Sequence, residues 1–264
     1  MAPEGWTVLR TEPQVETRIL PDLEALSHEG GIVFARIARE AISGRGRFAV
    51  ALSGGETPRR LYALLGSPLF QDEINWNGAH FFWADERCVP PEREESNFKW
   101  AWDLFLSKTP VPASNIHRIR GEEDPEKEAK RYETELRLFF GSEGPPRFDL
   151  VLLGVGDDGH TASLFPDSNA VEERTRLVLP VFLEEPKKNR ITLTLPVLNH
   201  ASKILFLVSG SSKAEVVKRI LAREKSAEKL PAALVKPDQG SVLWLIDEAA
   251  STKWLETDAG RLYT

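Results

Sequence analysis

The chain has 264 residues, of which 41% are hydrophobic and 28% charged, and these ordinary values exclude collagen-like, low-complexity and intrinsically disordered classes. Lys and Arg number 34 against 40 Asp and Glu, so the formal charge of −6 argues against a general binder of nucleic acid or of anionic membranes. Cys88 is the single cysteine, which excludes an intrachain disulfide and fits a reducing compartment.

We expect no signal peptide or membrane span from this sequence. Its first residues, MAPEGWTVLRTEPQ, lack a charged stretch followed by an apolar core, and no apolar run reaches the ~18 residues of a membrane span. No repeat, long linker or change in composition divides the sequence. We therefore expect a cytoplasmic protein that folds as one domain over residues 1–264.

Short apolar runs alternate with helical patterns along the chain. A helical spacing of apolar residues follows each of the first two predicted strands, and Asp124 is the expected N-cap of a charged helix that opens with Pro125 and reaches Phe140. A less regular excursion is expected over residues 171–188, because Pro180 and Pro186 interrupt it. The predicted strands span residues 48–52, 81–83, 148–155, 190–195, 203–208 and 241–246.

Strands separated by helices predict βαβ crossovers and an α/β fold whose mostly parallel sheet is covered on both faces. Ligands of such sheets bind at the carboxyl ends of the strands. The segments that follow the strands are therefore the candidate site: residues 53–55, 85–87, 156–160 and 209–213.

The first of these segments, in ALSGGETPRR, joins a strand to a helix through Ser53, Gly54 and Gly55. Glycines allow close approach to a ligand, and a helix that starts near Thr57 and Pro58 offers free N–H groups to an anion. The spacing is not that of a Walker A loop. The alternative is a plain turn in which Thr57 caps the helix.

The second segment contains Gly154, Gly156 and Gly159 in a G-x-G-x-x-G pattern. A dinucleotide site is rejected, because the Asp157 and Asp158 carboxylates would face a pyrophosphate and Pro166 prevents the long helix that the motif needs. The loop more simply presents Asp158 and His160, and an imidazole beside a carboxylate can take a proton from water. The alternative is a capping loop with a surface histidine.

The remaining segments offer cations. Arg87 can bind a phosphate bidentately, although an internal ion pair with Asp85 or Glu86 is the alternative. Lys213 closes a second anion cradle, SGSSK, which is alternatively a capped helix with an exposed lysine. Cys88 is interpreted as a packing residue. The spacings of metal ligands are absent, so no metal site is expected.

Taken in order, several segments resemble those of the 6-phosphogluconolactonase family. The resemblance extends from about residue 44 to residue 247, and DGHTASLFP is its most specific part. The matching segments are LSGGETP, WADER, ESNF, NIHRIRGE, FDLVLLGVGDDGHTASLFP, RITLTLPVLNHA, FLVSGSSK and LPAALVKP.

The resemblance implies a three-layer, modified Rossmann-like α/β fold of the glucosamine-6-phosphate deaminase and ribose-5-phosphate isomerase-like group. It implies hydrolysis of 6-phospho-D-glucono-1,5-lactone to 6-phospho-D-gluconate in the oxidative pentose phosphate pathway, without a cofactor or metal. The expected partner is this small sugar-phosphate lactone, with no nucleic acid or membrane, and the expected state is a monomer, with a dimer as the alternative. The related deaminases follow Asp-Gly-His with a Phe-Asn-Glu-Pro stretch, whereas residues 163–166 contain no carboxylate here.

The predicted roles follow from this activity. His160 is the expected general base toward water, and Asp158 either orients His160 or binds a sugar hydroxyl. A triad of Ser53, His160 and Asp158, as in a serine esterase, stays conceivable, as does a non-catalytic sugar-phosphate sensor. The residues expected to bind substrate or phosphate are Ser53, Gly54, Gly55, Thr57, Asp85, Arg87, Gly156, Arg190 and Lys213.

Overall fold

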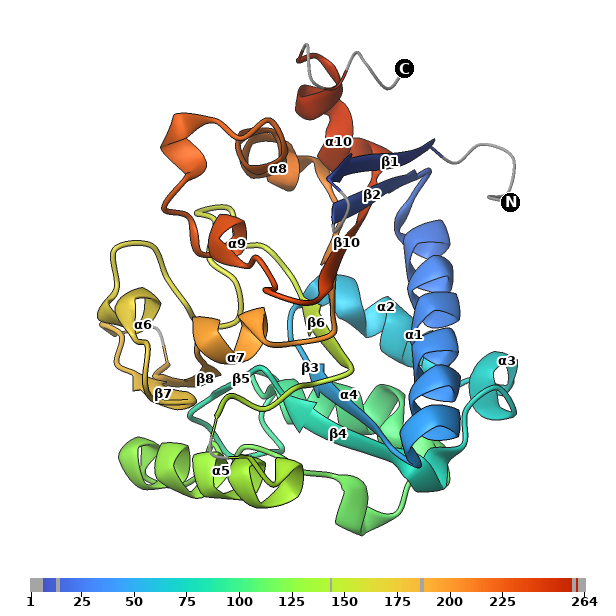
Figure 1. Cartoon of the computed structure of the whole chain (residues 1–264), viewed down its shortest axis with the longest axis vertical. Coiled ribbons are helices and arrows are strands. Elements are labelled where there is room, and N and C mark those ends of the chain that lie inside the picture. Colours follow the sequence, from blue (N-terminus) through green and yellow to red (C-terminus); the bar gives the residue numbers. More distant parts are fainter. Residues whose placement is uncertain (1–6, 13–14, 143, 186–187, 258–259, 261–264) are drawn as a thin grey trace.

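The structure is a computed structural model that describes residues 7–12, 15–142, 144–185, 188–257 and 260. A seven-stranded sheet runs through the molecule in the order β1-β2-β10-β9-β6-β3-β4 (Figure 1). The pair β1–β2 is antiparallel and the other neighbours are parallel. The strands are β1 (Thr7–Glu12), β2 (Val15–Leu20), β3 (Phe48–Leu52), β4 (Ala79–Trp83), β6 (Leu150–Leu153), β9 (Lys203–Val208) and β10 (Ser241–Asp247).

Helices cover both faces of this sheet. In Figure 1, α1 and α2 lie on one side, whereas α7, α8 and α9 lie on the other. Every residue of β3 and of β6 is buried, as expected for parallel strands covered on both faces. The helices are α1 (Leu23–Arg45), α2 (Glu56–Leu65), α3 (Pro68–Gln71), α4 (Asn97–Leu104), α5 (Pro125–Phe140), α6 (Asn169–Glu172), α7 (Leu195–Asn199), α8 (Ala214–Leu221), α9 (Pro231–Leu234) and α10 (Glu248–Leu255).

A second, three-stranded antiparallel sheet has the order β5-β8-β7. Its strands are β5 (Asp85–Arg87), β8 (Arg190–Leu193) and β7 (Val178–Val181). The strand β7 lies at the edge of this sheet. Its outer side pairs with no other strand of the sheet, so the missing N–H of Pro180 is tolerated there. Part of the predicted irregular excursion is therefore a strand, while Pro186 lies outside the described residues.

The expected α/β fold with a mostly parallel sheet is confirmed, and so is the start of α5. Asp124 is the N-cap of that helix, and its side chain accepts a hydrogen bond of 3.0 Å from the Lys127 N–H. Within the part of the chain that the structure describes, no helix is long and apolar enough to cross a membrane.

The strand order reverses between β3 and β6. After β3 the chain adds β4 on one side, whereas β6, β9 and β10 extend the sheet on the other side. Crevices at the carboxyl ends of strands beside such a switch point are the usual ligand sites of open α/β sheets. The loops that follow β3 and β6 are therefore where this fold is expected to bind a ligand.

Candidate active site

A cavity of about 440 Å³ lies at the carboxyl ends of β3, β6 and β9. It is lined by Ser53, Gly54, Gly55, Glu56, Thr57, Pro58, Asp85, Arg87, Asn97, Gly154, Val155, Gly156, His160, Ala162, Leu207, Val208, Ser209, Ser212 and Lys213. Another cavity, of about 370 Å³, lies near Trp244 and Ile220, is largely apolar, and contains none of the predicted site residues.

The loop after β3 forms one wall of the cavity. A methyl group on Gly54 would lie 1.7 Å from the Asn97 Oδ1, so only glycine fits this close approach. Gly55, with a φ of 100°, is the N-cap of α2, and among the described residues no side chain forms a capping hydrogen bond at the start of that helix. The alternative in which Thr57 caps the helix is therefore wrong, and the free helix N-terminus faces the cavity.

Ser53 lies at the start of this loop and is buried. Its hydroxyl donates a hydrogen bond of 2.6 Å to the carbonyl of Leu152 on β6, while the Tyr62 hydroxyl donates to the carbonyl of Ser53. The Ser53 proton is thus directed toward the backbone, whereas a nucleophile of a triad would direct it toward His160.

The loop after β6 presents His160 beside Asp158. The Asp158 Oδ1 lies 2.6 Å from the His160 Nδ1 and also accepts a 3.0 Å hydrogen bond from the His160 N–H. A carboxylate only accepts hydrogen bonds, so Nδ1 carries a proton, and in the neutral imidazole Nε2 then has the free lone pair. Partial burial raises the pKa of Asp158, but the hydrogen bonds from His160 outweigh it and lower this pKa overall.

Glycine is also required inside this loop. A methyl group on Gly156 would lie 2.0 Å from the His160 Nδ1. The Gly156 N–H donates to the carbonyl of His160 at 2.9 Å, which closes the turn. This N–H is therefore not free for a developing oxyanion.

The strand β5 brings Asp85 and Arg87 to the cavity. The buried Asp85 carboxylate accepts hydrogen bonds from the Ser163 hydroxyl at 2.7 Å and from the Asn97 Nδ2 at 3.2 Å. The Arg87 guanidinium donates to the carbonyl of Glu95 at 2.6 Å. Among the described residues no ion pair to that guanidinium is found, so neither internal ion pair considered for Arg87 forms.

Arg190 lies directly opposite Arg87 in the ladder between β5 and β8. Burial and the positive charge of Arg87 both lower the pKa of Arg190. Two like charges opposite one another in a sheet destabilise it unless an anion lies nearby. Arg190 does not itself line the cavity, but it adds positive charge beside Arg87.

Glu86, between Asp85 and Arg87, is buried on the other side of β5. Burial raises its pKa to about 7, although hydrogen bonds from the N–H groups of Asn97, Phe98 and Arg87 oppose this. Sequence inspection gave Glu86 no role beyond a possible ion pair.

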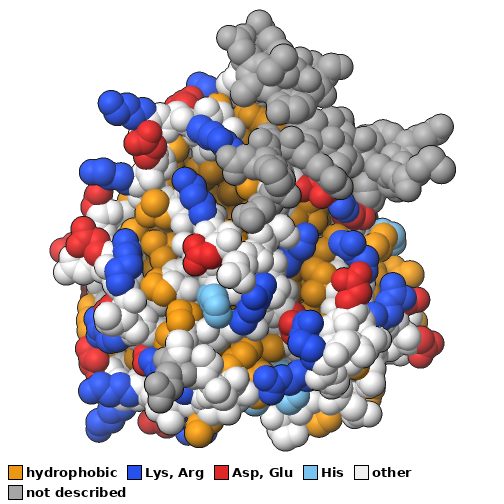
Figure 2. All heavy atoms as spheres, in the orientation of Figure 1, with side chains coloured by type: hydrophobic (Ala, Val, Ile, Leu, Met, Phe, Trp, Pro, Cys, Tyr) orange, Lys and Arg blue, Asp and Glu red, His pale blue; other side chains and the backbone are white. Residues whose placement is uncertain are grey.

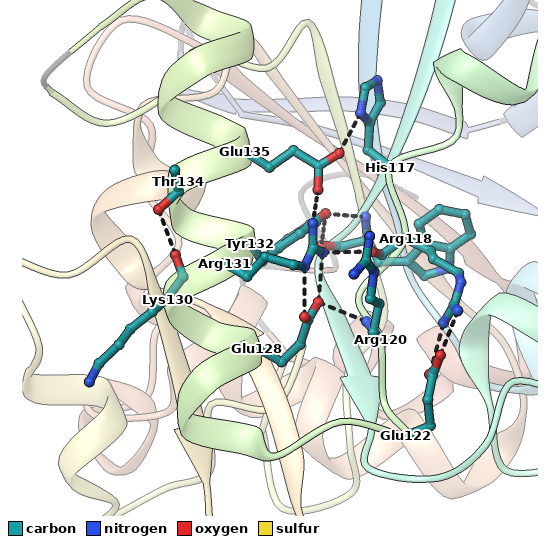
Figure 3. A network of polar contacts seen from close by, with 11 residues as sticks. His117, Arg118, Arg120, Glu122, Glu128, Lys130, Arg131, Tyr132, Thr134 and Glu135 are labelled. Carbon is teal, nitrogen blue, oxygen red and sulfur yellow. Dashed lines mark hydrogen bonds and ion pairs between the residues drawn. The ribbon is translucent and has the colours of Figure 1, made fainter.

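The helix α5 packs against the edge strand β4, which leads directly into β5. The buried Tyr132 hydroxyl accepts from the Trp83 N–H at 2.8 Å and donates to the Trp83 carbonyl at 3.2 Å, at the outer edge of β4. Figure 3 shows Arg131 on the same helix reaching both Glu128 and Glu135, and Glu135 reaching His117. This network covers an edge that would otherwise expose unpaired backbone groups.

Lys213 reaches the cavity from the opposite wall, at the end of a single turn formed by residues 211–213. Its ammonium lies 2.6 Å from the Asp157 Oδ1 in the loop after β6. Because the Asp157 side chain is 68% exposed, the pair is weak and an anionic ligand can compete with it.

The structure brings the predicted residues together. Ser53, Gly54, Gly55, Thr57, Asp85, Arg87, Gly156, His160 and Lys213 line the cavity, Asp158 contacts His160, and Arg190 lies opposite Arg87 on the neighbouring strand. Sequence reasoning missed Asn97 and Ser163, which hold Asp85. The available signal for Asn97 was the adjacent Ser96 and Asn97, a typical start of a helix. These residues entered the prediction only within the segment ESNF of the family resemblance.

Charges around the cavity are mixed. Basic and acidic side chains are interspersed over the face seen in Figure 2, in keeping with the net charge of −6. Over the described ranges, no group of three or more His, Cys, Asp or Glu side chains is arranged to hold a metal ion. The site can hold one small anion and move a proton at His160, which suits hydrolysis of an anionic substrate.

Comparisons with known proteins agree with this description. The profile of the family described as glucosamine-6-phosphate isomerases/6-phosphogluconolactonase matches residues 21–244. A protein of Synechocystis sp. named 6-phosphogluconolactonase is 38% identical over 241 residues, which cover 90% of this chain and 97% of that protein.

Solved structures show the same fold. The 6-phosphogluconolactonase of Trypanosoma brucei superposes with a TM-score of 0.78 at 28% identity, over 91% of this chain and 98% of that one. A monomeric glucosamine-6-phosphate deaminase superposes with a TM-score of 0.74 at 24% identity, over 91% and 99% of the two chains, and this likeness concerns the fold alone. The expected group of folds is thereby confirmed.

Proposed function

The chain belongs to the family of glucosamine-6-phosphate isomerases and 6-phosphogluconolactonases, and from that premise we propose that it hydrolyses 6-phospho-D-glucono-1,5-lactone to 6-phospho-D-gluconate. The observation that supports this most is the pair of His160 and Asp158 at a polar cavity that also contains Arg87. The reaction is a step of the oxidative pentose phosphate pathway.

The 6-phosphate binds at Arg87. This guanidinium lines the cavity and has no carboxylate partner among the described residues, so it can form two parallel hydrogen bonds to a phosphate. Arg190 strengthens the local positive charge, and Lys213 exchanges Asp157 for the ligand. Phosphate binding then holds the lactone in the cavity, and this binding, made equally in the ground state and the transition state, contributes to KM more than to kcat.

His160 activates the attacking water. Its Nε2 takes one proton while the water oxygen forms a bond to C1 of the lactone, and Asp158 stabilises the resulting imidazolium through Nδ1. The carbonyl oxygen becomes an oxyanion. Gly54, Gly55 and the uncapped start of α2 supply the backbone N–H groups that stabilise it.

Collapse of the tetrahedral intermediate breaks the bond between C1 and the ring oxygen. The imidazolium returns its proton from Nε2 to that oxygen, which becomes the C5 hydroxyl of the product. The new carboxylic acid loses a proton to solvent at neutral pH. Atoms balance as lactone plus water, and no cofactor or metal enters any step.

The structure favours this reaction over a serine esterase reaction, because the Ser53 hydroxyl donates to Leu152 and not to His160. The deaminase alternative needs a carboxylate in the segment after His160. Ser163 occupies that segment and donates its hydroxyl hydrogen to Asp85 instead.

The proposal is tested by incubating the lactone with the purified protein and identifying the product by NMR. We expect 6-phosphogluconate from the lactone and no ammonia from glucosamine 6-phosphate in a parallel reaction. Ammonia release, or an adduct of Ser53 with a fluorophosphonate probe, would instead establish one of the alternatives. We further expect a cytoplasmic monomer of one domain over residues 1–264 without nucleic-acid or membrane partners, and size-exclusion chromatography with light scattering tests the oligomeric state.

A further inference from the structure

Glu86 lies behind the cavity and not in it. Side chains alternate along a strand, so Asp85 and Arg87 face the cavity while Glu86 between them faces the start of α4. The residue is only 2% exposed. A buried carboxylate without a cation beside it needs other partners to offset its desolvation.

Four donors converge on this carboxylate. Its Oε1 accepts from the N–H groups of Arg87 and Asn97, both at 2.7 Å. Its Oε2 accepts from the Phe98 N–H at 2.8 Å and from the Ser96 hydroxyl at 3.1 Å. Because Ser96 is the N-cap of α4, Glu86 satisfies the first two N–H groups of that helix and joins it to β5.

The segment around Ser96 that Glu86 holds in place also positions two residues that line the cavity, Arg87 and Asp85. The Arg87 guanidinium donates to the carbonyl of Glu95, directly before Ser96. The Asn97 Nδ2 donates to the Asp85 carbonyl at 2.9 Å and to its carboxylate, while Gly54 closes over the Asn97 Oδ1. A shift of this segment would therefore move Arg87 and Asp85 together.

We propose that Glu86 is a positioning residue for substrate binding, because its carboxylate fixes the junction of β5 and α4 on which Arg87 and Asn97 depend. This inference rests on the proposed function, since it assigns the phosphate to Arg87. It predicts that loss of the carboxylate weakens binding of the phosphorylated ligand more than it slows the chemical step at His160.

Glu86→Gln is the sharpest variant, because it keeps the size of the side chain and replaces one acceptor oxygen by an NH2 group. Three backbone N–H groups point at the two oxygens, so the NH2 group faces at least one of them in either orientation. One buried N–H then lacks an acceptor, and the junction must shift to relieve it.

The matched control is Glu29→Gln. Glu29 is also a buried glutamate, 4% exposed, whose pKa is raised by burial, but it lies on α1 and pairs with Arg18 on β2. Glu29 does not line the cavity. Both variants should lose thermal stability, whereas only Glu86→Gln should alter ligand binding.

The experiment measures lactone hydrolysis and, separately, binding of the product 6-phosphogluconate by isothermal titration calorimetry. For Glu86→Gln we expect KM and the product Kd to rise about tenfold while kcat changes by about twofold or less. For Glu29→Gln we expect wild-type values of all three. Glu86→Asp keeps the charge with a shorter reach, so it should raise KM and Kd by an intermediate factor.

The outcomes are distinguishable. A wild-type protein that does not hydrolyse the lactone contradicts the proposed function. An active wild-type protein whose Glu86→Gln variant keeps its KM and Kd overturns the positioning role, as does an equal rise of KM in Glu29→Gln. If Glu86→Gln does not fold, Glu86→Asp decides, and unchanged binding in that variant overturns the proposal.

Discussion

Asp158→Asn separates the orientation of His160 from the proton transfer that His160 performs. Asparagine keeps the size of the side chain and an oxygen that can accept from the His160 N–H, which Asp158 now binds at 3.0 Å. It removes the negative charge that lies 2.6 Å from Nδ1. The imidazolium formed after proton abstraction then loses its counter-charge.

The expected magnitude follows from the exposure of the pair. A hydrogen bond to a charged group contributes about 1.5–3 kcal/mol. The side chains of His160 and Asp158 are 34% and 54% exposed, so solvent screening reduces this contribution, and we take the lower end. About 1.4 kcal/mol corresponds to a roughly tenfold decrease in kcat. Removal of the imidazole itself should cost more, ~10²–10⁴-fold.

The assay generates the lactone in situ by oxidation of glucose 6-phosphate and follows its disappearance, corrected for spontaneous hydrolysis. Asp157→Asn is the matched control, because Asp157 is the neighbouring carboxylate and pairs with Lys213 instead of His160. It should leave kcat unchanged. An unchanged kcat in Asp158→Asn would refute the orienting role, and a loss as large as that of His160→Ala would refute the argument from exposure.

Four further results are expected. His160→Ala should lower kcat by ~10²–10⁴-fold with little change in product affinity, measured by calorimetry. Arg87→Ala should raise KM by about tenfold or more at similar kcat, and an unchanged KM would place the phosphate elsewhere. Gly54→Ala should abolish activity in a folded protein, judged by circular dichroism, because its methyl group would collide with Asn97. Burial lowers the pKa of His80 to about 4, so stability contributed by neutral His80 is lost as the pH falls from about 6.5 toward 4. The free energies of unfolding of the wild type and of His80→Gln, measured by chemical denaturation, should converge as the pH falls over that range.

The central strands could be predicted because burial on both faces leaves a continuous apolar run. The bounds of β3 and β9 agree with the predicted ranges 48–52 and 203–208. The strand β5 could not be predicted, since its three residues are charged and their partners lie far away in the chain. The predicted strand 190–195 ends at Leu193, because Leu195 and Pro196 already belong to α7.

The site was predictable to the extent that the fold determines it. Parallel strands bring their carboxyl ends to one edge, so loops that follow strands gather there whatever their separation in sequence. The role of Glu86 was not predictable, because its donors lie up to 12 positions along the chain. The hydrogen bond from the Gly156 N–H to the His160 carbonyl was likewise not predictable from the sequence, because it depends on how the backbone turns between the two residues.

The most direct test of the account is the rate at which 6-phospho-D-glucono-1,5-lactone disappears at pH 7 with and without the purified protein. We predict a large acceleration over spontaneous hydrolysis in the wild type that is mostly lost in His160→Ala. Disappearance at the spontaneous rate in the presence of folded wild-type protein would contradict the account.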